Sequence, residues 1–310
     1  MTPTARAAAT LSQSIGNTPS VELPRFSRGA ARIVAKLEWF NPGGSVKDRI
    51  AKAMIEDGER RGLLAPGRTI VEPTSGNTGV ALAMLAAARG YRCVIVMPEG
   101  YGHAKAKLME GFGAKVVRTP AADRMSGAIA RAREIASMTP GAFLPNQFSN
   151  PVNPRAHYET TGPEIGRVLG DSIDAWVAGV GTTGTFTGVA RYLSERIPNL
   201  LRVAVEPQGS ILGGGKVGEH RVEGIGLSFF PEILERSLID EVIMIGDAEA
   251  FETCRQLARE EGLLVAGSSG AAAAAALRVA RRLGPGRTVV TLFPDGAERY
   301  PDQGILERIG

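Results

Sequence analysis

Strand patterns and helix patterns alternate along most of this 310-residue chain. Each short apolar stretch is followed by a turn and then by an amphipathic or alanine-rich stretch of helix length. The main strand patterns lie at 68–72, 92–97, 115–118, 175–180, 202–206 and 288–293. Such an alternation predicts an α/β fold in which parallel sheets carry helices on both faces.

The alternation restarts near residue 150, which indicates two lobes. We expect residues 41–150 to form a smaller, mobile lobe, and residues 1–40 together with 151–310 to form a larger one. Residues 1–20 are small and polar and are predicted to be an arm. Ligands of such sheets bind beyond the carboxyl ends of the strands, so the active site is expected in the cleft between the lobes.

The composition excludes several classes of function. Lysine and arginine (36) barely exceed aspartate and glutamate (32), and the basic residues are scattered, so no nucleic-acid partner is expected. The two cysteines and three histidines lack the spacing of metal ligands, so no metal is expected. There is no signal-peptide pattern and no apolar run of about 18 residues, so we expect a cytoplasmic protein without membrane contact.

One lysine stands out, in the stretch Asn41–Arg49. Glycines and a proline predict a tight loop there, and Ser45 is expected as the N-cap of a helix that runs to about Arg61. Lys47 then lies in the first helical turn, where the helix dipole favours acidic rather than basic side chains. A lysine near this positive end loses its proton more readily, which Schiff-base chemistry requires. The ordinary alternative is a solvated surface lysine.

Two glycine-rich turns follow strand patterns. The segment Gly179–Gly184 has the G-x-G-x-x-G form and Glu206 ends the next strand pattern, so NAD binding by an oxidoreductase stays open. The same loop and helix N-terminus can instead hold a single phosphate. The turn at 74–78 carries three side-chain donors and suits a carboxylate, unless it is an ordinary capped turn. A loop lysine, a phosphate cup and a carboxylate turn together indicate pyridoxal phosphate acting on an amino acid.

The chain resembles the fold-type II pyridoxal-phosphate enzymes, and within them the cysteine synthase/cystathionine β-synthase family. The resemblance extends from Ile15–Pro19 to Glu298–Tyr300 and so covers nearly the whole chain. Its motifs are Asn41–Arg49, Pro73–Gly79, Gly181–Thr185 and Gly267–Gly270, in family order. It implies a homodimeric transferase that forms L-cysteine from O-acetyl-L-serine and sulfide by replacement at the β-carbon.

The resemblance also implies residue roles. Lys47 binds the cofactor as a Schiff base and later moves the α-proton, Asn77 hydrogen-bonds the 3′-oxygen, and Ser268 faces the pyridine nitrogen. The residues expected to hold the phosphate are Gly181, Thr182, Thr183, Gly184 and Thr185. Those expected to bind the substrate are Thr74, Ser75, Thr78, Gln147 and Gly224. Of these, Thr74, Ser75, Thr78 and Gln147 are expected to bind its carboxylate.

The identities of the amino-acid donor and of the thiol or sulfide acceptor stay open. The segment Val222–Gly226 looks more like cystathionine β-synthases, which use serine and homocysteine, whereas His157–Ile165 looks more like cysteine synthases. Tyr101-Gly102 replaces the family's usual Met-Ser pair, and O-phosphoserine is a further possible donor. A non-catalytic binding partner is the remaining alternative, and the family implies docking of the C-terminal tail of serine acetyltransferase.

Overall fold

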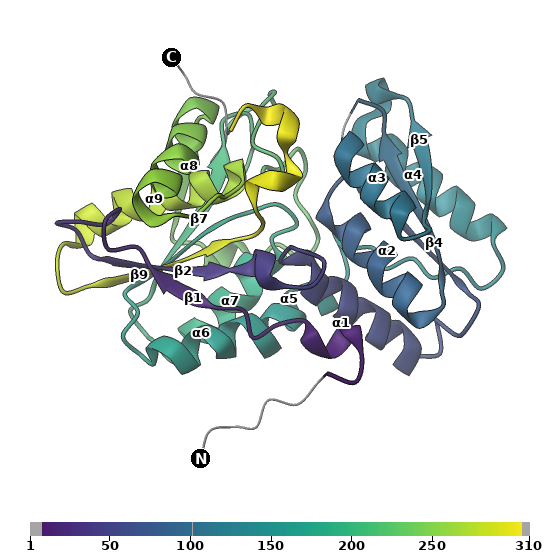
Figure 1. The fold of residues 1–310 in the computed structure, drawn as a ribbon, viewed down its shortest axis with the longest axis horizontal. Coiled ribbons are helices and arrows are strands. Elements are labelled where there is room, and N and C mark those ends of the chain that lie inside the picture. Colours follow the sequence, from purple (N-terminus) through teal and green to yellow (C-terminus); the bar gives the residue numbers. More distant parts are fainter. Residues whose placement is uncertain (1–7, 101, 306–310) are drawn as a thin grey trace.

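The structure of the protein is a computed structural model, and it describes residues 8–100 and 102–305. Its fold is built on two β-sheets (Figure 1). The larger sheet has the strand order β1-β2-β9-β6-β7-β8, and the smaller sheet has the order β3-β4-β5. The strands of the larger sheet are β1 (Ser20–Glu22), β2 (Arg32–Leu37), β6 (Ala175–Gly179), β7 (Leu201–Pro207), β8 (Glu241–Ile245) and β9 (Thr288–Phe293). Those of the smaller sheet are β3 (Thr69–Pro73), β4 (Arg92–Pro98) and β5 (Lys115–Thr119).

The strand pairs are parallel except at one edge, which confirms the predicted α/β class. There β1 pairs with β2 in antiparallel fashion. This strand was not predicted, because three residues are too few to show an alternating pattern. The last residue of the expected arm, Ser20, is therefore part of the sheet.

Helices cover both faces of each sheet. In the smaller sheet, Ile70 and Ile95 pack in one cluster with α2, while their neighbours Val71 and Val96 pack with α4 on the opposite face. In the larger sheet, α8 and α9 lie on one face and α7 on the other. The helices are α1 (Lys47–Arg60), α2 (Asn77–Arg89), α3 (His103–Gly111), α4 (Arg124–Met138), α5 (Val152–Ala156), α6 (Gly162–Leu169), α7 (Gly184–Ser194), α8 (Asp247–Glu261) and α9 (Gly267–Leu283).

Short turns of 3₁₀-helix complete the connections. They are η1 (Leu11–Ser14), η2 (Glu38–Phe40), η3 (Ala121–Asp123), η5 (Arg236–Leu238), η6 (Ala297–Arg299) and η7 (Pro301–Gln303). Between α5 and α6, His157–Thr161 form a π-helical turn where one continuous helix was predicted over 156–169. Pro163 explains the change of winding, since it has no N–H to donate to residue 159.

Helix α1 joins the two halves of the molecule. Ala51 and Ile55 pack in the cluster that contains α2, beside the smaller sheet. Ile50 and Met54 pack instead against α5, which follows the smaller sheet in the chain. The first turn of α1 is thereby placed between the two sheets. Within the described ranges, no helix is long and apolar enough to cross a membrane.

Candidate active site

A cavity of about 270 Å³ lies beyond the carboxyl ends of strands from both sheets. It is reached by the loops after β3, β6 and β9, as predicted for sheets of this kind. The predicted site residues that line it are Lys47, Thr74, Ser75, Asn77, Thr78, Gln147, Gly181, Thr182, Gly224 and Ser268. A smaller adjoining cavity is lined by Thr183 and Thr185 and shares Lys47 with the first.

Lys47 is the first residue of α1 and lines both cavities. Burial lowers the pKa of its amine below the ordinary value, while the negative charges of Asp295 and Glu38 oppose that shift. The prediction that Ser45 is the N-cap was wrong, since Val46 takes that position and has helical backbone angles. The Ser45 hydroxyl still accepts a hydrogen bond from the Lys47 N–H at 3.2 Å, so it steadies the same turn.

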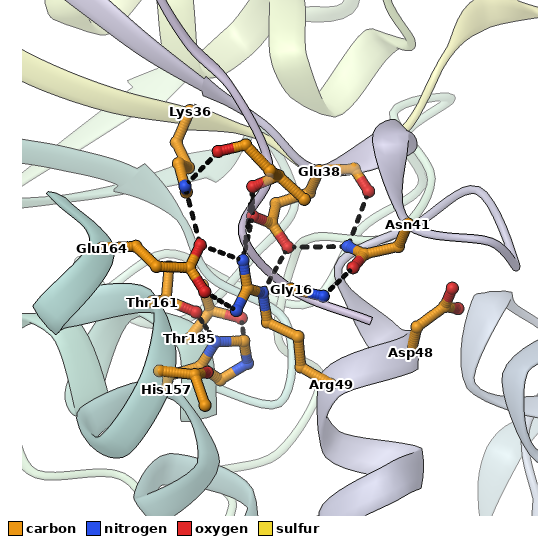
Figure 2. Close-up of polar contacts among 12 residues, drawn as sticks. Gly16, Lys36, Glu38, Asn41, Asp48, Arg49, His157, Thr161, Glu164 and Thr185 are labelled. Atoms are coloured by element: carbon orange, nitrogen blue, oxygen red, sulfur yellow. Dashed lines mark hydrogen bonds and ion pairs between the residues drawn. The ribbon is translucent and has the colours of Figure 1, made fainter. Parts of the chain in front are cut away.

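Arg49, half a turn after Lys47, anchors α1 to the larger sheet (Figure 2). Its guanidinium donates to both carboxylate oxygens of Glu38, with Nε–Oε2 at 2.7 Å, and to both oxygens of Glu164, with Nη1–Oε1 at 2.8 Å. Lys36 adds a second cation 2.8 Å from Glu164. Paired charges of this kind can be buried because each is satisfied by the others.

The N-terminal segment closes this charged cluster. The Asn17 N–H donates to Glu164 and the Gly16 N–H donates to Asn41, whose side chain also contacts Glu38. Gly16 has a φ of 95°, a conformation that favours glycine. These contacts give a structural role to Ile15–Pro19 and His157–Ile165, two motifs for which sequence reasoning had assigned no function.

The turn after β3 faces the first cavity. Thr78 donates to the side-chain oxygen of Gln147 at 2.7 Å, so two of the predicted carboxylate-binding residues touch each other. The Thr74 hydroxyl accepts the Gly76 N–H at 3.2 Å and shapes the turn before α2. Asn77 donates to Asp295 at 2.6 Å, a contact that the sequence did not predict.

The loop before α7 has the features of a phosphate cup. Thr183 adopts a φ of 71°, and its buried hydroxyl has no hydrogen-bond partner within the described residues. Thr185 contacts the Nε2 of His157 at 3.1 Å; burial lowers the pKa of this histidine well below its usual range. The helix N-terminus and the free hydroxyl fit a dianion. Gly184 lines neither cavity; instead its missing side chain makes room for Asn153.

The dinucleotide-binding alternative loses its support in this geometry. Glu206 does not face a ligand, because its carboxylate accepts the N–H groups of Leu212 and Gly213 at 2.9 and 2.8 Å. The Glu206 carboxylate is therefore not available to bind a ribose, whereas the dinucleotide interpretation requires that it be available. Ser268 is the second residue of α9 and lines the cavity, as expected of a residue that faces the cofactor.

The residues of the cavity wall that sequence reasoning missed include Asp295, Tyr300 and Lys105. The Tyr300 hydroxyl donates to Asp295, and the Lys105 ammonium lies 3.8 Å from the centre of the Tyr300 ring. Lys105 also pairs with Glu223 at 2.7 Å, which links α3 to the loop after β7. The available signals were the turn Pro294–Gly296 after a strand pattern and the motif Glu298–Tyr300 of the family resemblance. Tyr101 lies outside the described residues.

Other chemistry finds little support in the described part of the chain. No group of three or more histidine, cysteine, aspartate or glutamate side chains there could hold a metal ion. Cys93 and Cys254 are buried free thiols, and burial raises the pKa of each to about 12. Neither thiol is therefore a ready nucleophile.

Comparison with known proteins agrees with this geometry. Residues 11–295 match the family described as "Pyridoxal-phosphate dependent enzyme". The chain is 48% identical over 293 residues to the cysteine synthase of Staphylococcus aureus (strain Mu50 / ATCC 700699), covering 94% of each sequence. The solved O-acetylserine dependent cystathionine β-synthase of Helicobacter pylori is 45% identical, with a TM-score of 0.93 over 97% of this chain and all of that one.

A third relative has a different stated product. The solved structure of O-ureido-L-serine synthase is 40% identical and superposes with a TM-score of 0.94 over 98% of each chain. The predicted fold-type II architecture and the predicted cofactor are thus confirmed. This chain belongs to the family of pyridoxal-phosphate dependent enzymes.

Proposed function

We propose that the protein is a cysteine synthase, which forms L-cysteine and acetate from O-acetyl-L-serine and sulfide. The observation that carries the proposal is the placement of Lys47 between the turn at 74–78 and the loop at 181–185. A 48% identical relative named cysteine synthase supports the same reaction. The bond from the β-carbon to the acetoxy oxygen breaks, and a bond from the β-carbon to sulfur replaces it.

The wall of the cavity fits the cofactor. The free Thr183 hydroxyl and the backbone of residues 181–185 would hold the phosphate, Asn77 would contact the 3′-oxygen, and Ser268 would face the ring nitrogen. When bound through Lys47, pyridoxal phosphate withdraws electrons from the α-carbon of the amino acid. A hydroxyl at Ser268, rather than a carboxylate, would leave the ring nitrogen largely unprotonated and would so favour loss of the β-group over transamination.

Side chains of this protein would bind the donor and accept its α-proton. Thr74, Ser75, Thr78 and Gln147 would bind the donor carboxylate and orient the α-hydrogen toward Lys47. The unprotonated amine of Lys47 then accepts the α-proton, consistent with the lowered pKa of that group. We also propose that residues 41–150 form a mobile lobe that closes on the rest when this turn is filled, excluding water.

Lys47→Ala tests the proposal. The purified wild-type protein should absorb visible light, bind the cofactor covalently, and form cysteine from O-acetylserine and sulfide. The variant should lose covalent attachment and turnover while keeping its fold, as judged by circular dichroism. Full turnover by the variant, or a wild type that neither absorbs nor responds to added cofactor, would refute the assignment.

A second candidate is cystathionine formation, in which homocysteine replaces sulfide. The 45% identical structure of the O-acetylserine dependent cystathionine β-synthase of Helicobacter pylori favours it. Measuring kcat/KM for sulfide and for homocysteine, with O-acetylserine and with serine as donors, separates the two. A tenfold preference, about 1.4 kcal/mol in transition-state binding, decides the acceptor.

O-phosphoserine is a weaker candidate for the donor. The lysines that line the cavity are Lys47, which would be bonded to the cofactor, and Lys105, which is paired with Glu223. Neither offers a free positive charge to a leaving phosphate. No turnover of O-phosphoserine is therefore expected under conditions in which O-acetylserine reacts.

We further propose a cytoplasmic homodimer that can dock the C-terminal tail of serine acetyltransferase in the same cavity. The tail's terminal carboxylate would use the turn at 74–78. Sedimentation tests the dimer. A tail peptide should compete with O-acetylserine, and failure to compete at high peptide concentration would remove the partner. The complete set of site residues argues against a non-catalytic binding protein.

A further inference from the structure

Gln147 is held on three sides. Its backbone N–H donates to Glu72 Oε1 at 3.0 Å, its carbonyl accepts from Asn153 Nδ2 at 2.8 Å, and its side-chain oxygen accepts from Thr78 at 2.7 Å. We propose that Glu72 and Asn153 are positioning residues that fix Gln147 for the carboxylate of the amino-acid donor. The inference rests on the proposed function, in which Gln147 and Thr78 bind that carboxylate.

Glu72 holds the segment from the side of the smaller sheet. It is the penultimate residue of β3 and is completely buried. Its second oxygen accepts the N–H of Asn146 at 2.8 Å, and Asn146 has a φ of 56°. A non-glycine residue in this left-handed region costs free energy that the two hydrogen bonds offset. The carboxylate therefore determines where the backbone of Gln147 lies.

Asn153 holds the same segment from the other side. It is 1% exposed and belongs to α5. Besides Gln147, its Nδ2 donates to the Thr182 hydroxyl of the phosphate loop at 3.1 Å. Its Oδ1 occupies the space where a side chain at Gly184 would lie. One amide thus ties the carboxylate subsite to the phosphate subsite.

These contacts predict different effects for the two residues. In Glu72→Gln, the amide can accept one backbone N–H but presents its own N–H₂ to the other. Gln147 then shifts, while the phosphate loop keeps its contacts. In Asn153→Ala, both Gln147 and Thr182 lose a partner. We expect weaker donor binding in the first variant, and weaker binding of both donor and cofactor in the second.

Glu206→Gln is a matched control. Glu206 is the penultimate residue of β7, is completely buried, and accepts two consecutive backbone N–H groups, as Glu72 does. The residues that it holds, Leu212 and Gly213, do not line the cavity. The control variant should lose about as much stability as Glu72→Gln without any change in donor binding.

The experiment measures four quantities for the wild type and the three variants. They are the donor dissociation constant, from the change in visible absorbance on adding O-acetylserine; KM and kcat with sulfide; and the dissociation constant of pyridoxal phosphate. We expect Glu72→Gln to raise the donor constants by about tenfold, which is 1.4 kcal/mol, with cofactor affinity unchanged. Asn153→Ala should raise both donor and cofactor constants.

The inference would be overturned if the donor dissociation constants of Glu72→Gln and Asn153→Ala both stayed within twofold of the wild-type value. It would also be overturned if Glu206→Gln raised the donor dissociation constant as much as Glu72→Gln does. If Glu72→Gln does not fold, Asn153→Ala decides the donor test alone. A wild type that binds O-acetylserine without turning it over refutes the proposed function, and the binding constants still test the positioning roles. A wild type that does not bind the amino acid refutes both.

Discussion

Arg49, two residues after Lys47 on α1, forms a two-pronged ion pair with Glu38, with Nε–Oε2 at 2.7 Å and Nη2–Oε1 at 3.0 Å. Both side chains are almost completely buried. Glu164 and Lys36 complete a cluster of two cations and two carboxylates (Figure 2). Since Lys47 and Arg49 both belong to α1, the cluster determines where the Lys47 amine lies relative to the larger sheet.

Removing the central cation should destabilise the protein strongly. Arg49→Met leaves two buried carboxylates with one lysine, and we expect a loss of about 3–5 kcal/mol in the free energy of unfolding. Urea unfolding of the cofactor-loaded protein measures it. Arg259→Met is the control, because Arg259 pairs with Glu252 at 2.8 Å on the surface and should contribute less than about 1 kcal/mol. Equal losses in the two variants would contradict the role of the cluster.

The same cluster predicts loss of stability in acid. Burial alone raises the pKa of Glu164, but the hydrogen bonds and charges of Arg49 and Lys36 outweigh it and lower the pKa to about 2. Because this folded-state pKa lies below the ordinary value of 4.5, the contribution is present above pH 4.5 and lost as the pH falls toward 2. Unfolding free energies between about pH 5 and pH 3 should fall less steeply in Glu164→Gln than in the wild type. Parallel slopes would contradict this.

The charge of Asp295 should tune cofactor attachment. It opposes the burial that lowers the pKa of Lys47, so Asp295→Asn lowers that pKa further and frees more amine at a given pH. The rate at which apoprotein binds pyridoxal phosphate covalently, followed by visible absorbance, should then reach its midpoint at a lower pH. Glu223→Gln, a change in the same cavity wall, should leave the midpoint in place. A midpoint that stays or rises in Asp295→Asn would count against the electrostatic argument.

Much of the fold could be predicted from local pattern. The strand predicted at 288–293 coincides with β9, and those at 92–97 and 115–118 each lack only the last residue of β4 and β5. Parallel strands buried on both faces are continuous apolar runs, which are easy to recognise. β1 was missed, because its three residues carry no periodicity.

The candidate site was predictable where residues follow one another in a turn, and less so where contacts join distant segments. Lys47 and the loop at 181–185 stand out because a helix N-terminus and glycines determine their chemistry locally. Arg49 and Glu164 are 115 residues apart, and nothing in either segment names the other as partner. Glu72 looks like an ordinary strand residue, and its role becomes visible only through the backbone that it holds.

Gly184 should be intolerant of a single added methyl group, although it lines neither cavity. An alanine Cβ there would overlap the side-chain oxygen of Asn153, so Asn153 must move and release Thr182. We expect Gly184→Ala to lower the free energy of unfolding by about 1–3 kcal/mol. Its affinity for pyridoxal phosphate should fall as well. Gly111→Ala is the control, because Gly111 is also a terminal residue of a helix, but apart from its two neighbours in the chain no side chain and no backbone outside its own helix comes within 4 Å of the added carbon. That variant should be unchanged or up to about 1 kcal/mol more stable, since alanine loses less backbone entropy than glycine on folding.

Urea unfolding and cofactor titration of both variants measure the changes in stability and in cofactor affinity. A Gly184→Ala protein as stable and as well loaded as Gly111→Ala would show that Asn153 does not need this space.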